Sequence, residues 1–304
     1  MIYTDQTGRF PTLSSRGHKY IMFLCEVDGN YIALEPMRSR EVKEIIKTYN
    51  SILDRLAVQG IKPKHQMLDN KASKEYLKMI ENRGMTWELA PPGNHRRNLA
   101  EKMIQTGKNH ITSNPIGCVE SFPMREWDRL LPQMEITLNM LRPSNVVATI
   151  SAHSYLHGVH DYNKMPLGPL GCKTQCIVSP EERRSFGTHS IELWYIGMSP
   201  DHYRCHKVFV KETKAVRITD TLLFHHKEIT QPTVTVADAL VTAAANLTEA
   251  VKTHLTNDLS TLNLSELSIH TLSGRTQARR GWALYRRYGR PHNREHQGDE
   301  CVPR

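Results

Sequence analysis

The sequence predicts an α/β domain with a mixed sheet flanked by helices, followed by a small all-β module and a tail that is first helical and then basic. In the first half of the chain, three β-rich runs precede an alternation of helical and strand patterns, which implies parallel and antiparallel neighbours in one sheet. Beyond residue 166, strand patterns recur about every ten residues, as in small barrels and sandwiches. The 304 residues are 39% apolar, enough for about two domains with a buried core.

The amino-terminal strands are expected to form a hairpin next to a first strand. The first strand covers Ile2–Asp5, and two longer β-rich runs cover Lys19–Glu26 and Tyr31–Glu35. Between these two runs stands Asp28-Gly29-Asn30, a strong hairpin turn signal. These three segments form the antiparallel part of the expected sheet.

Helical and strand patterns then alternate along the chain. Apolar residues at three- and four-residue spacing predict a helix from Val42 to Leu56, with Ser39 as its N-cap and Gly60 as its stop. The elements expected after it are a strand at His65–Leu68, a helix around Tyr76–Ile80 closed by Gly84, a strand at Met85–Leu89, a loop at Ala90–Asn94, a helix from Asn98 to about Ile111, and a helix from Met124 to Leu141 that Pro132 kinks.

The segment Pro166–Cys172 marks a boundary, so the expected domains are 1–165, 166–228 and 229–304. The strands expected in the second domain are Cys176–Val178, Ile191–Gly197, Tyr203–Val210 and Ala215–Thr219. In the third domain a helix is expected from Val234 to about Leu255, followed by a disordered basic tail. Eight Arg and three acidic residues in the last 34 positions carry more than half of the net charge of +9.

Composition excludes several classes of protein. There is no apolar run long enough to span a membrane and no signal-peptide pattern, so the protein is expected to be intracellular and not secreted. The six scattered cysteines are then expected to be free thiols. A zinc site is an alternative, but its spacing is not a standard one and the first two cysteines fit a strand. The residues of that alternative are Cys172, Cys176, His202, Cys205 and His206.

Three acidic residues stand out by their position. Asp5 falls in the first strand, Asp69 follows the strand after the first long helix, and Glu101 falls early in the helix after the Pro/Gly loop. Carboxylates gathered at a strand edge repel one another, and divalent cations relieve that repulsion. Two such ions are the usual clamp for phosphoryl displacement. Most of the 31 acidic residues nevertheless serve as solvated surface, so spacing alone leaves this site open.

The motifs in order resemble the integrase core of copia-type retrotransposons, a branch of the retroviral integrase superfamily with a ribonuclease-H-like fold. They are TDQTGRFP at 4–11, LDN at 68–70, HRRNLAEK at 95–102 and EWDRLLPQMEITLNMLRPS at 126–144. The stretch from PLGPLGC at 166–172 to about residue 228 resembles the SH3-like module that follows this core. The resemblance covers about residues 1–228.

The resemblance implies an Asp, Asp, Glu triad made of Asp5, Asp69 and Glu101. These residues would hold Mg²⁺ or Mn²⁺. The implied activity is that of a polynucleotidyl transferase and endonuclease: 3′-end processing of element DNA, then strand transfer into target DNA. The implied partners are element-end DNA, target DNA and further copies of the chain. The implied location is the nucleus or a cytoplasmic retroelement particle.

Basic residues near the triad are candidates for DNA contact. Arg96 and Arg97 precede the helix that carries Glu101, and Lys102 and Lys108 lie on it. Lys108 is seven residues after Glu101 and therefore on the same face. Asn70 is expected to orient the loop after Asp69. The run Arg275–Arg290 suits a phosphate-and-stacking tail, and a linker with a chance Arg bias is an equal alternative.

Two further functions stay open from the sequence. A catalytically inactive nucleic-acid-binding remnant is favoured by the short first strand and by 31 residues between Asp69 and Glu101, where the superfamily commonly has about thirty-five. The residue at the longer spacing is Gln105. The second alternative is a ribonuclease-H-like nuclease without joining activity, against which the SH3-like segment argues.

Overall fold

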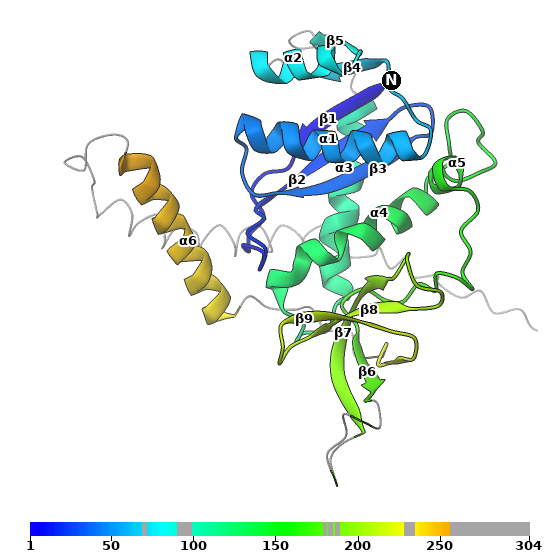
Figure 1. Ribbon diagram of the computed structural model, residues 1–304, viewed down its shortest axis with the longest axis vertical. Helices are drawn as coiled ribbons and strands as arrows, with labels where there is room; N and C mark the ends of the chain where they lie inside the picture. Colours follow the sequence, from blue (N-terminus) through cyan, green and yellow to red (C-terminus); the bar gives the residue numbers. More distant parts are fainter. Residues whose placement is uncertain are drawn as a thin grey trace, which may run out of the picture. The chain divides into compact units, whose positions relative to one another are not determined.

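The computed structural model describes residues 1–68, 72–89, 99–178, 181, 185, 189–227 and 235–255. The chain divides into two compact units, residues 1–239 and residues 240–304. Both sheets belong to the first unit (Figure 1). No helix in the described part of the chain is long and apolar enough to cross a membrane.

The first sheet has five strands in the order β3-β2-β1-β4-β5. Its strands are β1 (Ile2–Gln6), β2 (Tyr20–Glu26), β3 (Tyr31–Met37), β4 (His65–Leu68) and β5 (Thr86–Leu89). The first three strands are antiparallel, whereas β4 is parallel to both β1 and β5. This order and these directions are those of a ribonuclease-H-like sheet, so the predicted α/β class is confirmed.

Turn chemistry accounts for the hairpin and for the helix stops. Asn30 has a positive φ of 57° in the β2–β3 turn, a conformation that Asn tolerates well. Gly60 and Gly84, at φ of 80° and 72°, end the two helices where the sequence predicts it. The predicted N-cap Ser39 is wrong, because the first helix begins after Glu41, whose side chain makes no capping hydrogen bond.

Helices cover both faces of this sheet (Figure 1). One face is covered by α1 (Val42–Val58), α2 (Lys74–Asn82) and α5 (Ala152–His157), which share a core with Ile2 and Leu24 of the sheet. The other face is covered by α3 (Leu99–Ser113) and α4 (Leu131–Met140), which share a core with Tyr3 and Phe23. Alternation along β1 therefore sends Tyr3 and Asp5 toward α3, and Thr4 and Gln6 toward α1 and α2.

The expected single helix from Met124 to Leu141 is two separate elements. A 3₁₀ helix, η3 (Met124–Arg129), ends before α4 begins, and Pro132 stands in the first turn of α4. Proline has no N–H to donate, and the first turn of a helix needs none from it. Pro132 thus starts a helix instead of kinking one. A second short 3₁₀ helix, η2 (Asn114–Gly117), follows α3, and α5 is an element that the sequence reading missed.

The second sheet is all antiparallel and has the order β10-β6-β7-β8-β9. Its strands are β6 (Lys173–Ile177), β7 (Ser190–Met198), β8 (His206–Val210), β9 (Ala215–Thr219) and β10 (Leu223–Phe224). A register shift between Tyr195 and Gly197 lies in β7, and Gly197 takes a φ of 148° that favours glycine. The predicted all-β module is confirmed; its SH3-like character stays a prediction.

The two sheets share one hydrophobic core. Trp194 and Tyr195 of β7 pack in the same buried cluster as Trp127 and Leu130. The Tyr195 hydroxyl donates to Oε1 of Gln133 on α4 at 2.7 Å. The described residues therefore form a continuous core across the predicted boundary at residues 165/166.

The helix α6 (Val236–Leu255) is described by itself and lies where the sequence predicts a helix. Thr235 and Asp238 cap it reciprocally: the Asp238 N–H donates to Thr235 Oγ1 at 3.1 Å, and the Thr235 N–H donates to Asp238 Oδ2 at 3.2 Å. The predicted basic tail beyond residue 255 lies outside the described residues.

Candidate functional site

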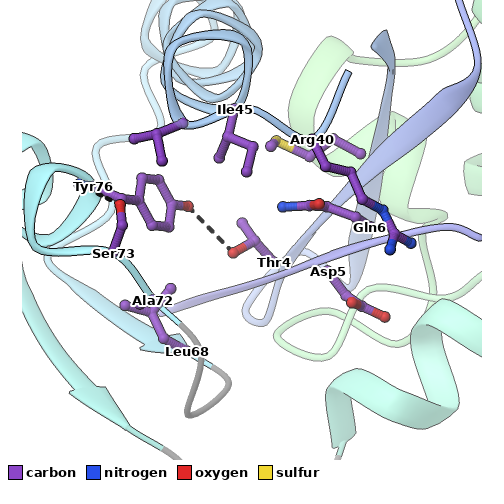
Figure 2. A pocket seen from close by; sticks show the side chains of 11 residues that line it. Thr4, Asp5, Gln6, Arg40, Ile45, Leu68, Ala72, Ser73 and Tyr76 are labelled. Atoms are coloured by element: carbon purple, nitrogen blue, oxygen red, sulfur yellow. Dashed lines mark hydrogen bonds between the residues drawn. The ribbon is translucent and has the colours of Figure 1, made fainter. Parts of the chain in front are cut away.

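Asp5 stands near the carboxyl end of β1, the middle strand of the first sheet. Its side chain is 49% exposed, and it points away from Gln6, toward the α3 side of the sheet (Figure 2). The neighbouring parallel strand β4 ends at Leu68. Carboxyl ends of parallel neighbours are where polar functional groups of such sheets collect.

A close approach of α3 to β2 brings the helix to this part of the sheet. Gly107 lies over Phe23, and a Cβ atom built on Gly107 would be 2.5 Å from Phe23 Cε1. Met103, Ile104 and Ile111 are the buried apolar residues of the same helix face. Glycine therefore suits this position, because a Cβ atom here would force the Phe23 ring or the helix to shift.

Lys108 lies next to the packed face of α3 and reaches Asp5. Its Nζ atom is 3.7 Å from Asp5 Oδ2, and both side chains are partly exposed. A half-exposed pair of this kind contributes little stability, of order 0–1 kcal/mol. Its significance is chemical: the exposed carboxylate at the end of β1 already has a cation against it.

The other residues of the predicted site divide into two groups. Glu101 is in the first turn of α3 and Lys102 follows it; both are exposed. Asp69, Asn70, Arg96 and Arg97 lie outside the described residues. The structure thus brings Asp5 and Lys108 together, and it places Glu101 on the helix that carries Lys108.

A buried polar network behind Asp5 joins β1, β4, α1 and α2. Gln66 of β4 is fully buried and donates through Nε2 to Thr4 Oγ1 at 2.8 Å and to the Tyr76 hydroxyl at 3.1 Å. The Tyr49 hydroxyl donates to Gln66 Oε1. Burial raises the pKa of Tyr76 to about 12, so this hydroxyl stays protonated at neutral pH. A buried amide is tolerated only when it is bonded in this way.

The sequence reading missed this network. Its signal is Gln66 inside the apolar strand pattern of His65–Leu68, since a polar residue at a core position is unusual. Gln66 fixes β1 against β4 by side-chain bonds in addition to the backbone ladder. It therefore helps to hold the end of β1, and Asp5 with it, beside the end of β4.

A cavity of about 380 Å³ opens on the opposite side of β1 (Figure 2). It lies between the sheet and the beginnings of α1 and α2. The residues that line it are Thr4, Asp5, Gln6, Met22, Arg40, Val42, Ile45, Leu68, Ala72, Ser73 and Tyr76.

The sequence leaves two metal sites open, the carboxylate triad and a zinc site. Within the described ranges, no three or more His, Cys, Asp or Glu side chains lie close enough to share an ion, and Asp69 is outside these ranges. At the alternative zinc site, Cys176 lies on β6 with its Sγ atom 3.2 Å from Thr219 Oγ1. Cys172 is buried, His206 is buried in β8, and Cys205 is partly exposed.

The solved structures that are similar to this chain include two retroviral integrase structures. No protein-family model matches the chain, and no curated protein matches it. The catalytic core domain of BIV integrase is similar at 13% identity and a TM-score of 0.38, over 51% of this chain and 91% of that one. A chain of the simian T-cell lymphotropic virus intasome, in complex with PP2A regulatory subunit B56 gamma, is similar at 12% identity and a TM-score of 0.34, over 73% and 80%. At these values neither similarity carries an argument, and the fold assignment rests on strand order and direction.

Proposed function

We propose that this chain is an integrase-like enzyme that cuts and joins DNA strands with the help of divalent metal ions held by Asp5, Asp69 and Glu101. The observation that carries the proposal is the position of Asp5 at the carboxyl end of the middle strand, against the parallel strand β4. Asp69 directly follows Leu68, the last residue of β4.

The strand register supports the pairing of the two aspartates. The ladder pairs Ile2 with Gln66 and Tyr3 with Met67. Two more residues along each chain lead from Tyr3 to Asp5 and from Met67 to Asp69. We therefore propose that these two carboxylates share one end of the sheet.

The position of Glu101 on helix α3 supports its role as the third carboxylate. Glu101 and Lys108 are seven residues apart, nearly two turns, so they lie on one stripe about 10.5 Å apart along the axis. Lys108 fixes this stripe to the Asp5 side of the sheet. Glu101 is the acidic residue of the helix's first turn on the same stripe.

The donor chemistry suits Mg²⁺ or Mn²⁺. Carboxylate oxygens are the hard ligands that these ions prefer, and the exposed Asp5 oxygen already has the Lys108 ammonium beside it. When bound, such ions would favour deprotonation of the attacking hydroxyl and stabilise the leaving oxygen. Asp5, Asp69 and Glu101 would hold them.

The proposed reaction has two steps, and each is a displacement at a phosphorus atom. In end processing, a water oxygen bonds to phosphorus, the bond to the 3′-oxygen breaks, and that oxygen leaves as a 3′-hydroxyl. In strand transfer, this hydroxyl attacks a phosphate of target DNA and displaces the 3′-oxygen there. The proton of each attacking group ends on the leaving oxygen or in solvent.

DNA would be held mainly through its phosphates. Lys102 and Lys108 on α3, with Arg96, Arg97 and Asn70, are the proposed contacts, and their charge makes binding salt-dependent. The proposal also divides the chain into a catalytic core at 1–165, an SH3-like module at 166–228 and a tail at 229–304. Assembly of several copies around the DNA ends belongs to it as well.

The test incubates the full chain with a labelled DNA duplex that has a recessed 3′-end, target plasmid and Mn²⁺. We expect nicking and joining for the unmodified chain and none for Asp69→Asn or Asp5→Asn, with DNA binding retained. Gln105→Ala, on the exposed side of α3, is the matched control and should stay active. If the unmodified chain shifts DNA but is as inert as Asp69→Asn, the chain is an inactive binding remnant and the enzyme proposal fails.

A further inference from the structure

The cavity on the α1 and α2 side of β1 combines apolar walls with a few polar side chains. Met22, Ile45 and Leu68 supply apolar wall, and the ring of Tyr76 closes one side (Figure 2). Its volume, about 380 Å³, falls within the range of small-molecule pockets. Flat aromatic bases suit such walls, since they bury apolar faces while their edges need hydrogen bonds.

Three polar side chains in the cavity differ in their hydrogen bonds: two are bonded to Gln66 and the third is not. The Thr4 and Tyr76 hydroxyls lie 3.4 Å apart, and both accept from Gln66. Gln6 points into the same space, and its carboxamide makes no hydrogen bond to another described residue (Figure 2). A carboxamide offers one donor and one acceptor side by side, which complements the edge of adenine.

Arg40 adds a cation to the lining of the cavity. Arg40 donates through Nη2 to the Thr7 carbonyl, and its guanidinium lies 5.0 Å from the centre of the Tyr20 ring. These contacts leave further guanidinium donors, because the group has five N–H bonds. An arginine held in place in this way is suited to a phosphate.

We infer that this cavity binds the base of an unpaired nucleotide, adenine best, with Gln6 reading its edge and Arg40 on its phosphate. The inference rests on the proposed function for its source of nucleotides: an unpaired base at a DNA end held near Asp5. The cavity adjoins the triad through Asp5, which also lines it, but Thr4 and Gln6 face the side of β1 opposite to the Lys108 contact.

The experiment titrates deoxyadenosine 5′-monophosphate into the full chain labelled with ¹³C at its methionine methyl groups. Met22 lines the cavity and reports occupancy, and a Met22→Leu variant assigns its signal. We expect the Met22 signal to shift with a dissociation constant in the millimolar range. Ribose 5-phosphate, which has the phosphate without the base, should leave the signal unchanged.

Two substitutions localise the binding. Gln6→Leu keeps a side chain of similar size and should weaken binding about tenfold, because a bidentate contact with a base is worth roughly 1–3 kcal/mol. Ile45→Trp fills the cavity and should abolish the shift. Gln105→Ala, at an exposed position of α3 that does not line the cavity, should not weaken nucleotide binding. Thermal unfolding checks that each variant is folded. If Gln6→Leu does not fold, Ile45→Trp provides the test of binding in its place.

Three outcomes would overturn the inference: no Met22 shift with the nucleotide, an equal shift with ribose 5-phosphate, or unchanged nucleotide affinity in both folded variants. Because no metal and no catalysis enter this measurement, its result is independent of the joining assay. A chain that binds the nucleotide as expected but joins no DNA would contradict the proposed enzyme and leave the nucleotide site standing.

Discussion

The ammonium of Lys108 lies 3.7 Å from the Asp5 carboxylate, at the end of the middle strand of the sheet. Asp5 is the first of the three acidic residues proposed to hold metal, and Lys108 is one of the residues proposed to hold DNA. Under these two proposals, one side chain would neutralise the carboxylate in the free protein and would become available to phosphate once a metal ion had bound the carboxylate. Metal binding and DNA binding would then be linked through this pair.

Replacing Lys108 by Gln should move the two affinities in opposite directions. Mn²⁺ affinity is expected to rise by up to about fivefold, because a competing ion pair worth about 0–1 kcal/mol has been removed from Asp5. DNA affinity should fall, and its dependence on salt should weaken by about one phosphate contact. Electron paramagnetic resonance of free Mn²⁺ measures the first effect, and fluorescence anisotropy of labelled DNA at several salt concentrations measures the second.

Lys102→Gln is the matched control for this pair of measurements. Lys102 is exposed on the same helix, but Lys108 is the residue of α3 that contacts Asp5 in the described structure. The control should reduce the salt dependence of DNA binding without changing Mn²⁺ affinity. A fall in Mn²⁺ affinity on Lys108→Gln would show that this lysine supports the metal site and does not compete with it.

Gly107→Ala should destabilise the protein, although alanine is the better helix former. The new Cβ would meet Phe23 Cε1 at 2.5 Å, and Phe23 is fully buried, so the ring has little room to move. Overpacking of this kind costs about 1–3 kcal/mol, whereas the gain in helix propensity is at most about 1 kcal/mol. Urea unfolding followed by circular dichroism measures the net loss.

A second substitution separates the clash from other effects of Gly107→Ala. Phe23→Leu shortens the side chain beneath the helix, so Gly107→Ala should cost less in a Phe23→Leu background than alone. An equal cost in both backgrounds would mean that the close approach of α3 to β2 is not the cause.

Asn139→Ala should cost about 2–6 kcal/mol of unfolding free energy. Asn139 is fully buried on α4; its Oδ1 accepts from the Ile32 N–H and its Nδ2 donates to the Ile32 carbonyl, both at 2.8 Å. Because β3 is an edge strand, this side chain takes the place of a missing neighbour strand. Alanine would leave both groups of Ile32 buried and unpaired, at about 1–3 kcal/mol each. Asn109→Ala, on exposed α3 surface, should change stability by less than about 0.5 kcal/mol.

How far the sequence predicts this structure depends on the range of the interaction. The strands and helices of the first sheet follow from local periodicity and from glycine stops such as Gly60 and Gly84, which act within a few residues. The network around Gln66 and the contact of Gly107 with Phe23 join segments distant in sequence, and no local pattern encodes them. For the same reason the sequence motifs identify Asp5 and Glu101 as candidate site residues, but only the fold shows that Lys108 reaches Asp5.

A cluster of three histidines should make the fold sensitive to acid. The ring of His153 stacks on His157 at 4.9 Å between centroids and meets His160 edge-on at 5.5 Å; the rings of His153 and His160 are buried. Burial, followed by the neighbouring histidines His157 and His160, lowers the pKa of His153 to about 4. Burial also lowers the pKa of His157, while Glu135 raises it and Arg55 lowers it. His157 reaches these two charges through the Tyr31 hydroxyl, which lies within hydrogen-bond distance of His157 and donates to Glu135, and Arg55 donates to Glu135 as well.

The sign of the effect follows from these directions. A histidine with a folded pKa of about 4 and an unfolded pKa of about 6.5 binds its proton more readily when unfolded. Its contribution to stability is complete above about pH 6.5 and is lost as the pH falls toward about 4, to a total of about 3 kcal/mol. Asp128, whose pKa is lowered from 3.8 by its hydrogen bond with His18 and by Arg16, loses its contribution only at lower pH, so the two effects are separable.

Urea unfolding of the full chain at about pH 7.5 and about pH 5 tests this expectation. The unmodified chain should lose stability between the two, and His153→Leu should lose clearly less, because the variant has one fewer group that takes up a proton on unfolding. His189→Gln, an exposed histidine outside the cluster, should lose as much as the unmodified chain. If His153→Leu shows the same loss as the unmodified chain, the acid sensitivity arises elsewhere, and His153 is then protonated in the folded protein at about its ordinary pKa.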